Sequence, residues 1–195
     1  GFKAVALDAA ASLELSSRSV QKTSRNVLGV LPGRSAPDEA VVFMAHWDHL
    51  GTHPDEPGDN IYNGAVDNAT GVAGILEIAE AFRKAKTPPK RSILFLSVTL
   101  EESGLLGSKY YDAHPVIPLD KTVAVFNLDA LSPVGKARNI TVIGKGSSEL
   151  EDLLKTETDK QQRRIVDENN IASGFYFRSD HFNFAKAGVP ALYIN

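Results

Sequence analysis

Apolar runs of strand length alternate with helical patterns along most of this 195-residue chain. The strand-like runs cover residues 26–31, 40–45, 92–98, 122–128, 140–143 and 191–194. The run at 40–45 is apolar on both faces, which is typical of a central strand in a parallel sheet. These runs therefore predict a sheet whose middle strands are buried on both sides.

The clearest helical pattern covers residues 68–86. Its apolar positions recur at helical spacing and are Val72, Ile75, Leu76, Ala79 and Phe82. Asn68 or Thr70 is placed to cap this helix, and Pro88 prevents its extension. Weaker helical patterns lie near 104–113 and 147–160. The alternation predicts an α/β fold, a three-layer sandwich in which helices flank a mixed, mostly parallel central sheet.

Composition and charge exclude some classes of partner. The formal net charge is -3, with 21 basic and 24 acidic residues and no basic stripe, so we expect no nucleic-acid partner. No apolar run approaches the roughly 20 residues that a membrane span needs. Cysteine is absent, so a metal site in this chain would use His, Asp and Glu side chains.

Six acidic or imidazole side chains share one kind of location, the end of a predicted strand or the start of the long helix. They are His46, Asp48, Asp67, Glu101, Glu102 and Asp129. In open α/β sheets the carboxyl ends of the strands line the ligand crevice. These side chains could therefore meet in space although they lie far apart in the sequence.

The residue types suit a two-metal hydrolytic site. The candidate zinc ligands are His46, Asp67, Glu102 and Asp129, and one carboxylate could bridge two ions about 3.5–4 Å apart. Asp48 could accept the second imidazole N–H of His46 and fix its tautomer. Glu101 cannot point the same way as Glu102, so it could instead take a proton from water and return it to the leaving amine.

Each candidate also has an ordinary structural interpretation. Asp67 could stabilise the helix dipole, Asp129 could begin a turn, and Glu101 with Glu102 could be a solvated pair. His46 alone could be a capping group. The remaining early and middle histidines have no comparable placement and are interpreted as loop residues; they are His49, His53 and His114. The recurrence of such groups at strand ends favours the metal site.

Five ordered motifs between about residues 26 and 195 resemble the co-catalytic di-zinc aminopeptidase family, the group of the bacterial leucyl aminopeptidases and glutamate carboxypeptidase. The motifs are Ala45-His46-Trp47-Asp48-His49-Leu50-Gly51, Asn63 to Gly71, Leu100 to Ser108, Asn127-Leu128-Asp129 and Arg178-Ser179-Asp180-His181-Phe182. The resemblance implies two zinc ions in the intact protein. It assigns His46 and Asp129 to one zinc, Glu102 to the other and Asp67 to both. It also makes Glu101 the general acid/base, Asp48 the group that orients His46, and Arg178 a substrate contact.

The resemblance also implies boundaries. We expect residues 1–25 to be an N-terminal remnant or linker, and residues 26–195 to be the zinc peptidase catalytic domain, truncated at its C-terminal end. The family places a further histidine ligand beyond the last matched motif, and without it the zinc at Glu102 should bind weakly. His181 is expected to support the pocket without ligating. Secretion or a periplasmic location is suggested by the resemblance only.

The resulting hypothesis is a zinc-dependent aminopeptidase acting on peptides. Two alternatives use the same fold, a carboxypeptidase and a glutaminyl cyclase-like enzyme. A third is a catalytically silent, metal-stabilised binding module. The aromatic residues Trp47, Tyr176 and Phe177 either line the substrate pocket or pack in the core.

Overall fold

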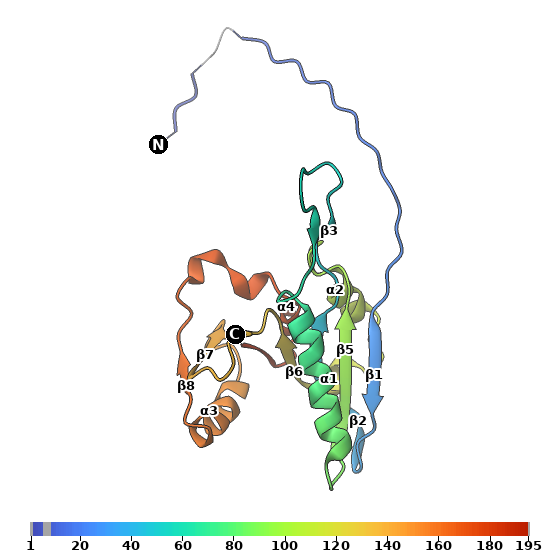
Figure 1. Cartoon of the computed structure of the whole chain (residues 1–195), viewed down its shortest axis with the longest axis vertical. Coiled ribbons are helices and arrows are strands. Elements are labelled where there is room, and N and C mark those ends of the chain that lie inside the picture. The colour runs from blue at the N-terminus through green and yellow to red at the C-terminus, as the bar shows by residue number, and fades with distance from the viewer. Residues whose placement is uncertain (1, 6–8, 195) are drawn as a thin grey trace.

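Seven strands form one mixed sheet within residues 2–5 and 9–194, the parts of the chain that the computed structural model describes (Figure 1). The strands are β1 (Val27–Leu31), β2 (Ala36–His46), β5 (Arg91–Val98), β6 (Thr122–Leu128), β7 (Asn139–Ile143), β8 (Arg164–Val166) and β9 (Ala191–Ile194). Their order across the sheet is β1-β5-β2-β6-β9-β7-β8. Strands β5, β2, β6 and β9 are parallel, whereas β1 and β7 run antiparallel to β5 and β9.

Helices cover both faces of the sheet, so the predicted three-layer α/β sandwich is confirmed. The helices α1 (Ala69–Lys84) and α3 (Leu150–Lys160) lie on one face, and α2 (Leu106–Ala113) and α4 (His181–Lys186) lie on the other. Successive side chains of β2 point to opposite faces of the sheet and so contact different helices. Phe43 points to α1, where its ring centroid lies 6.1 Å from that of Phe82. Met44 points to the opposite face and packs in a buried cluster with Tyr111 and Phe184.

Several short elements were not predicted from the sequence. The segment expected to be a loop contains a small hairpin of β3 (Gly51–Thr52) and β4 (Ile61–Tyr62). Strand β8, helix α4 and three single-turn helices, η1 (Leu119–Lys121), η2 (Ile171–Ser173) and η3 (Phe175–Phe177), were also missed. Elements of two to six residues carry too few positions for a hydrophobic period to appear.

The N-terminal segment has a different character. Residues 9–26 contain no helix or strand and are largely exposed, and Figure 1 shows the N-terminal stretch extending away from the sheet. The domain boundary at residues 25/26 stays a prediction. Within the described residues, no helix is both long and apolar enough to cross a membrane.

Adjacent parallel strands bring the candidate residues to one edge of the sheet. His46, the last residue of β2, is in register with Val98 at the end of β5. Two residues earlier, Met44 is in register with Asn127 of β6. The acidic pair lies in the turn after β5, and Asp129 lies in the turn after β6. These two turns therefore begin on either side of His46.

Asn68 joins the start of α1 to the end of β6. Its side-chain oxygen accepts hydrogen bonds from the backbone N–H of Gly71 at 3.0 Å and of Ala130 at 3.1 Å, and its amide donates to the carbonyl of Leu128 at 2.9 Å. Of the two cap candidates expected from the sequence, Asn68 and Thr70, the structure has Asn68 as the cap. The same contacts hold the preceding residue, Asp67, beside Asp129.

We expect Asn68→Ala to lower the free energy of unfolding by about 2 kcal/mol or more, since it removes a cap and leaves buried backbone groups unpaired. Urea denaturation in the presence of a chelator measures this change. Glu77→Ala, an exposed substitution on the same helix, should stay within about 0.5 kcal/mol of the original protein. A similarly small change for Asn68→Ala would refute the role given to this residue.

Candidate active site

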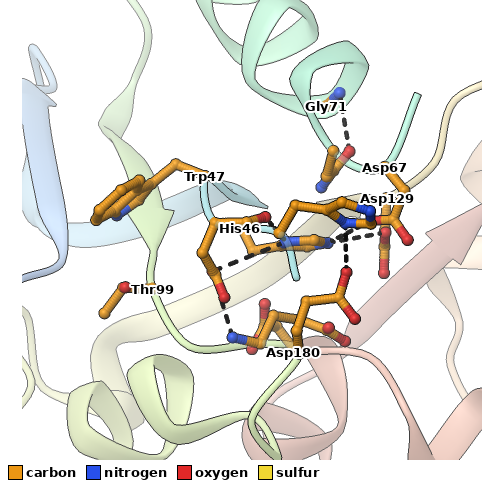
Figure 2. A network of polar contacts seen from close by, with 12 residues as sticks. His46, Trp47, Asp67, Gly71, Thr99, Asp129 and Asp180 are labelled. Carbon is orange, nitrogen blue, oxygen red and sulfur yellow. Dashed lines mark hydrogen bonds and ion pairs between the residues drawn. The ribbon is translucent and has the colours of Figure 1, made fainter. Parts of the chain in front are cut away.

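His46, Asp67 and Asp129 meet at the sheet edge (Figure 2). The Nε2 atom of His46 lies 3.0 Å from Oδ1 of Asp67 and 3.2 Å from Oδ1 of Asp129. His46 is 1% exposed, so its ring is fixed by its surroundings. Three groups that are remote in sequence thus present one nitrogen and two oxygens to a common point.

The backbone of Asp48 fixes the orientation of the His46 ring. Nδ1 of His46 donates a hydrogen bond to the backbone carbonyl of Asp48 at 3.0 Å, whereas the Asp48 carboxylate lies 3.9 Å away. The acceptor therefore differs from the expected carboxylate. The carboxylate instead accepts a hydrogen bond from the backbone N–H of Glu101 at 3.4 Å. Since Nδ1 carries the donated hydrogen, Nε2 of neutral His46 offers its lone pair to the site.

A chain of hydrogen bonds that the sequence did not predict fixes the orientation of the Asp129 carboxylate. The hydroxyl of Ser179 donates to Oδ2 of Asp129, and the amide of Asn127 donates to the Ser179 hydroxyl at 2.6 Å. Ser179 belongs to a motif recognised in the sequence, but only the folded chain shows that it contacts Asp129. These bonds leave Oδ1 of Asp129 directed at His46.

The acidic pair follows β5 through a strained turn. Leu100 has a φ of +56°, a left-handed conformation that costs free energy for a non-glycine residue. After this turn Glu101 is 9% exposed, and both Glu101 and Glu102 line the same cavity. Glu102 contacts an imidazole, with its Oε1 atom 2.6 Å from Nδ1 of His49.

His49 lies in the loop after β2, as expected, but it also contacts Glu102, which the sequence did not predict. His49 follows β2 and turns back toward Glu102, and no pattern in the sequence distinguishes it from His53. By contrast, His53 lies in the exposed β3–β4 hairpin, where its ring packs on Tyr62, and His114 stacks on Tyr110 at the end of α2.

The site carries an excess of negative charge. Burial by itself would lower the pKa of His46, but the hydrogen bond with Asp129 and the surrounding carboxylates raise it to about 9. Burial raises the pKa of Glu101 to about 8, opposed by the charge of His46 and reinforced by those of Asp180 and Asp129. Burial would also raise the pKa of Asp129, yet its hydrogen bonds to His46 and Ser179 hold it below the usual value. Such a group of carboxylates is stabilised by added positive charge.

The donor set fits zinc. One nitrogen and two oxygens from His46, Asp67 and Asp129 lie within 4.8 Å of one another, and so do ligand atoms of a second group that shares Asp67. Oδ1 of Asp67 is buried and faces Nε2 of His46 at 3.0 Å, but it forms no well-oriented hydrogen bond in the described part of the chain. Imidazole nitrogens and carboxylate oxygens are ordinary zinc ligands.

A cavity of about 400 Å³ opens in front of the carboxylates. Its lining includes Asp67, Glu101, Glu102, Asp129, Ile143, Glu168, Phe175, Arg178 and Tyr193. Arg178, the predicted substrate contact, is thus at the cavity wall, with its guanidinium 5.5 Å from the centre of the Phe175 ring. Trp47 and Tyr176 are not in this lining. The indole of Trp47 donates to the backbone of Arg25, and Tyr176 packs against His181.

The turn after Arg178 places two buried side chains, Asp180 and His181, next to the site. Asp180 is completely buried and accepts a hydrogen bond from the hydroxyl of Ser108. Burial raises the pKa of Asp180 to about 7. His181 is equally buried and its ring lies between Tyr176 and Tyr193, with centroid distances of 5.0 and 5.1 Å. Its place in this packing is consistent with the supporting role predicted from the sequence.

We expect His181 to make the protein less stable as the pH falls. Burial lowers its pKa to about 4 from an ordinary value of 6.5, and the charge of Asp129 only partly opposes this. Between these pH values the unfolded chain binds a proton on His181 that the folded chain does not. The free energy of unfolding therefore falls through this window, by up to about 3 kcal/mol at its acid end.

Chemical denaturation of the original protein and of His181→Phe, from pH 7 to pH 4, measures this effect. The stability of the variant relative to the original should rise as the pH falls. His114→Phe, at an exposed position, should show no such trend. A stability difference between His181→Phe and the original that does not change with pH would count against the buried neutral imidazole.

Comparison with known proteins agrees with this geometry. Residues 26–195 match the model of peptidase family M28. The chain is 31% identical over 142 residues to aminopeptidase NAALADL1 of Mus musculus, which covers 70% of this chain and 17% of that protein. The solved structure of BSAP, a zinc aminopeptidase from Bacillus subtilis, is 25% identical with a TM-score of 0.65, and covers 87% of this chain and 39% of that one. A glutaminyl cyclase structure from Porphyromonas gingivalis, 19% identical with a TM-score of 0.65 over 86% of this chain and 62% of that one, shares the fold.

The chain belongs to peptidase family M28. The resemblance to zinc aminopeptidases stated from the sequence motifs is thereby confirmed. The chain spans well under half the length of these two aminopeptidases.

Proposed function

We propose that the protein is a zinc-dependent aminopeptidase that removes N-terminal residues from peptides. The observation that carries this proposal is the meeting of His46, Asp67 and Asp129 at one point of the cavity edge. Membership of peptidase family M28 and the likeness to a zinc aminopeptidase support the same reaction.

In this proposal His46 and Asp129 hold one zinc ion, Glu102 holds a second, and Asp67 is shared by both. When bound, the zinc ions supply Lewis acidity, which polarises the scissile carbonyl and lowers the pKa of water. The backbone carbonyl of Asp48 keeps Nε2 of His46 available as a ligand. Ser179 keeps Asp129 in its orientation.

Glu101 is the general acid/base. Its carboxylate lines the cavity beside the zinc ligands, where it can take a proton from the attacking water and deliver it to the leaving amine. The turn at Leu100 and the bond from the Glu101 N–H to Asp48 hold this side chain in place. Arg178 at the cavity wall is available to the substrate.

The preference for an N-terminus follows from charge. The cavity is lined by the carboxylates of the zinc ligands, Glu101 and Glu168, and by the guanidinium of Arg178. Bound zinc would neutralise the ligand carboxylates, which leaves Glu101 and Glu168 as the acidic groups that attract the positive charge of a free α-amino group and repel a C-terminal carboxylate. The acidic lining favours an aminopeptidase over a carboxypeptidase.

Parallel assays on the zinc-loaded protein test the proposal. An aminoacyl-nitroanilide should be hydrolysed, whereas a dipeptide blocked at its N-terminus and free at its C-terminus should not. Cyclisation of a peptide with N-terminal glutamine would instead support a cyclase. Zinc binding without turnover of any of these substrates would support a binding module and contradict the proposed enzyme.

A further inference from the structure

One acidic side chain of the cavity belongs neither to the candidate zinc ligands nor to the proton transfer. Glu168 lines the cavity together with Asp67, Glu101 and Asp129, but it follows β8, the strand at the edge of the sheet. We propose that Glu168 binds the positively charged side chain of a substrate's N-terminal residue, so that peptides beginning with lysine or arginine are preferred. This inference rests on the proposed function, whose substrate class it specifies.

The turn after β8 places Glu168 in a part of the cavity wall away from the zinc ligands. Val166 of β8 is in register with Thr141 of β7, and Glu168 follows two residues later. Thr141 and Ile143, which share one face of β7, line the same cavity. Strands β9 and β7 lie between β8 and β6, the strand that leads to Asp129. Glu168 and Asp129 therefore approach the cavity from different sides.

The Glu168 carboxylate has no partner that balances its charge. None of the ion pairs within the described ranges, 2–5 and 9–194, involves Glu168, and its Oε1 atom is buried without a hydrogen-bond partner there. By contrast, the neighbouring carboxylate of Asp167 is exposed and pairs with Lys145. Partly buried charges are stabilised by pairing, so a cation brought by the substrate would stabilise Glu168.

Bound zinc would not supply this charge. Glu168 belongs to neither of the potential ligand groups, in contrast to Asp67, Glu102 and Asp129. A substrate's α-amino group and its scissile carbonyl are bonded to the same carbon, so the amino group stays beside the metal ligands and Glu101. The side chain leaves that carbon in another direction and can extend toward Glu168.

The wall between the two ends of the cavity suits an apolar stem. Ile143 and Tyr193 are buried residues that line it, and Phe175 adds an aromatic ring. Burial raises the pKa of the Tyr193 phenol, and the charges of Asp129 and Glu168 are among those that raise it further, so Tyr193 lies within electrostatic reach of both. Lysine and arginine combine an apolar stem with a charged end. A volume of about 400 Å³ is in the range of small-molecule sites.

The cation in this lining, Arg178, makes an acidic side chain the competing choice. Arg178 is exposed, and its guanidinium lies over the Phe175 ring at 5.5 Å from the ring centre. Glu168 is only partly exposed and has one buried oxygen. Solvent screens a buried charge less than an exposed one, so the interaction with Glu168 should be the stronger.

Kinetics on the zinc-loaded protein with the nitroanilides of lysine, norleucine and glutamate test the proposal. Norleucine keeps the α-amino group and the unbranched stem of lysine but lacks the ammonium group. We expect kcat/KM to be highest for lysine. In Glu168→Gln the ratio of kcat/KM for lysine to that for norleucine should fall about 10–100-fold, the range expected for a hydrogen bond to a charged group.

Two further variants complete the test. Asp167→Asn removes the adjacent, exposed carboxylate, which is absent from the cavity lining, and should leave the ratio unchanged. Glu168→Lys reverses the charge and should make the glutamate substrate better than the lysine substrate. The preference of the original protein needs no variant, so the test holds even if a substitution impairs folding.

The outcomes separate this inference from the proposed function. Equal losses on lysine and norleucine in Glu168→Gln, or an original protein that prefers norleucine or glutamate, would overturn the role of Glu168 and leave the aminopeptidase proposal standing. Failure of the zinc-loaded protein to hydrolyse any of the three substrates would overturn the proposed function, and this inference with it.

Discussion

Replacing Glu101 with glutamine should lower kcat by about 10²–10⁴-fold while zinc remains bound. The amide has almost the same shape but cannot take a proton from the attacking water. Because the carboxylate lines the cavity beside the zinc ligands, the loss falls on proton transfer and not on metal binding. In free energy this is about 3–5 kcal/mol of lost transition-state stabilisation.

Steady-state kinetics on an aminoacyl-nitroanilide, with zinc content measured on the same samples, tests this expectation. Glu77→Gln makes the same chemical change at an exposed position of α1 and should leave both kcat and zinc content unchanged. If Glu101→Gln retained near-normal kcat, another group would have to be the general base. If it lost zinc as well, Glu101 would act as a ligand.

Asp67→Asn should have the largest effect on metal binding, because Asp67 belongs to both potential ligand groups. The substitution keeps the shape but removes the negative charge that two cations would share. We expect zinc affinity at both positions to fall by at least about 100-fold, more than the loss of a supporting hydrogen bond costs. Activity should fall with it.

Single substitutions in each separate group provide the comparison. Asp129→Asn should weaken only the zinc held with His46, and Glu102→Gln should weaken only the other, as measured by calorimetric titration and zinc content. If Asp67→Asn still bound two ions with the affinity of the original protein, Asp67 would not be the shared ligand.

The sheet edge where the site lies could be predicted from the sequence. His46, Glu101 and Asp129 each follow a run of apolar residues, and parallel strands bring such positions to one edge. Asp67 was placed there by the cap of α1, since Asn68 ties the helix start to the end of β6. In these cases a local pattern determines the position of the side chain.

The remaining contacts depend on tertiary packing that local patterns do not contain. His49 contacts Glu102 from a loop, and nothing in its neighbours separates it from His53. Ser179 reaches Asp129 from 50 residues away in the sequence. The preference of the His46 ring for a backbone carbonyl over the Asp48 carboxylate depends on loop geometry, which residue types alone do not specify.

A crystal structure of the zinc-loaded protein, with anomalous scattering recorded at the zinc edge, tests the central claim most directly. We expect an anomalous peak at about 2.0–2.2 Å from Nε2 of His46 and from a carboxylate oxygen of each of Asp67 and Asp129. Crystals that contain zinc elsewhere but show no peak between these three side chains would contradict the account.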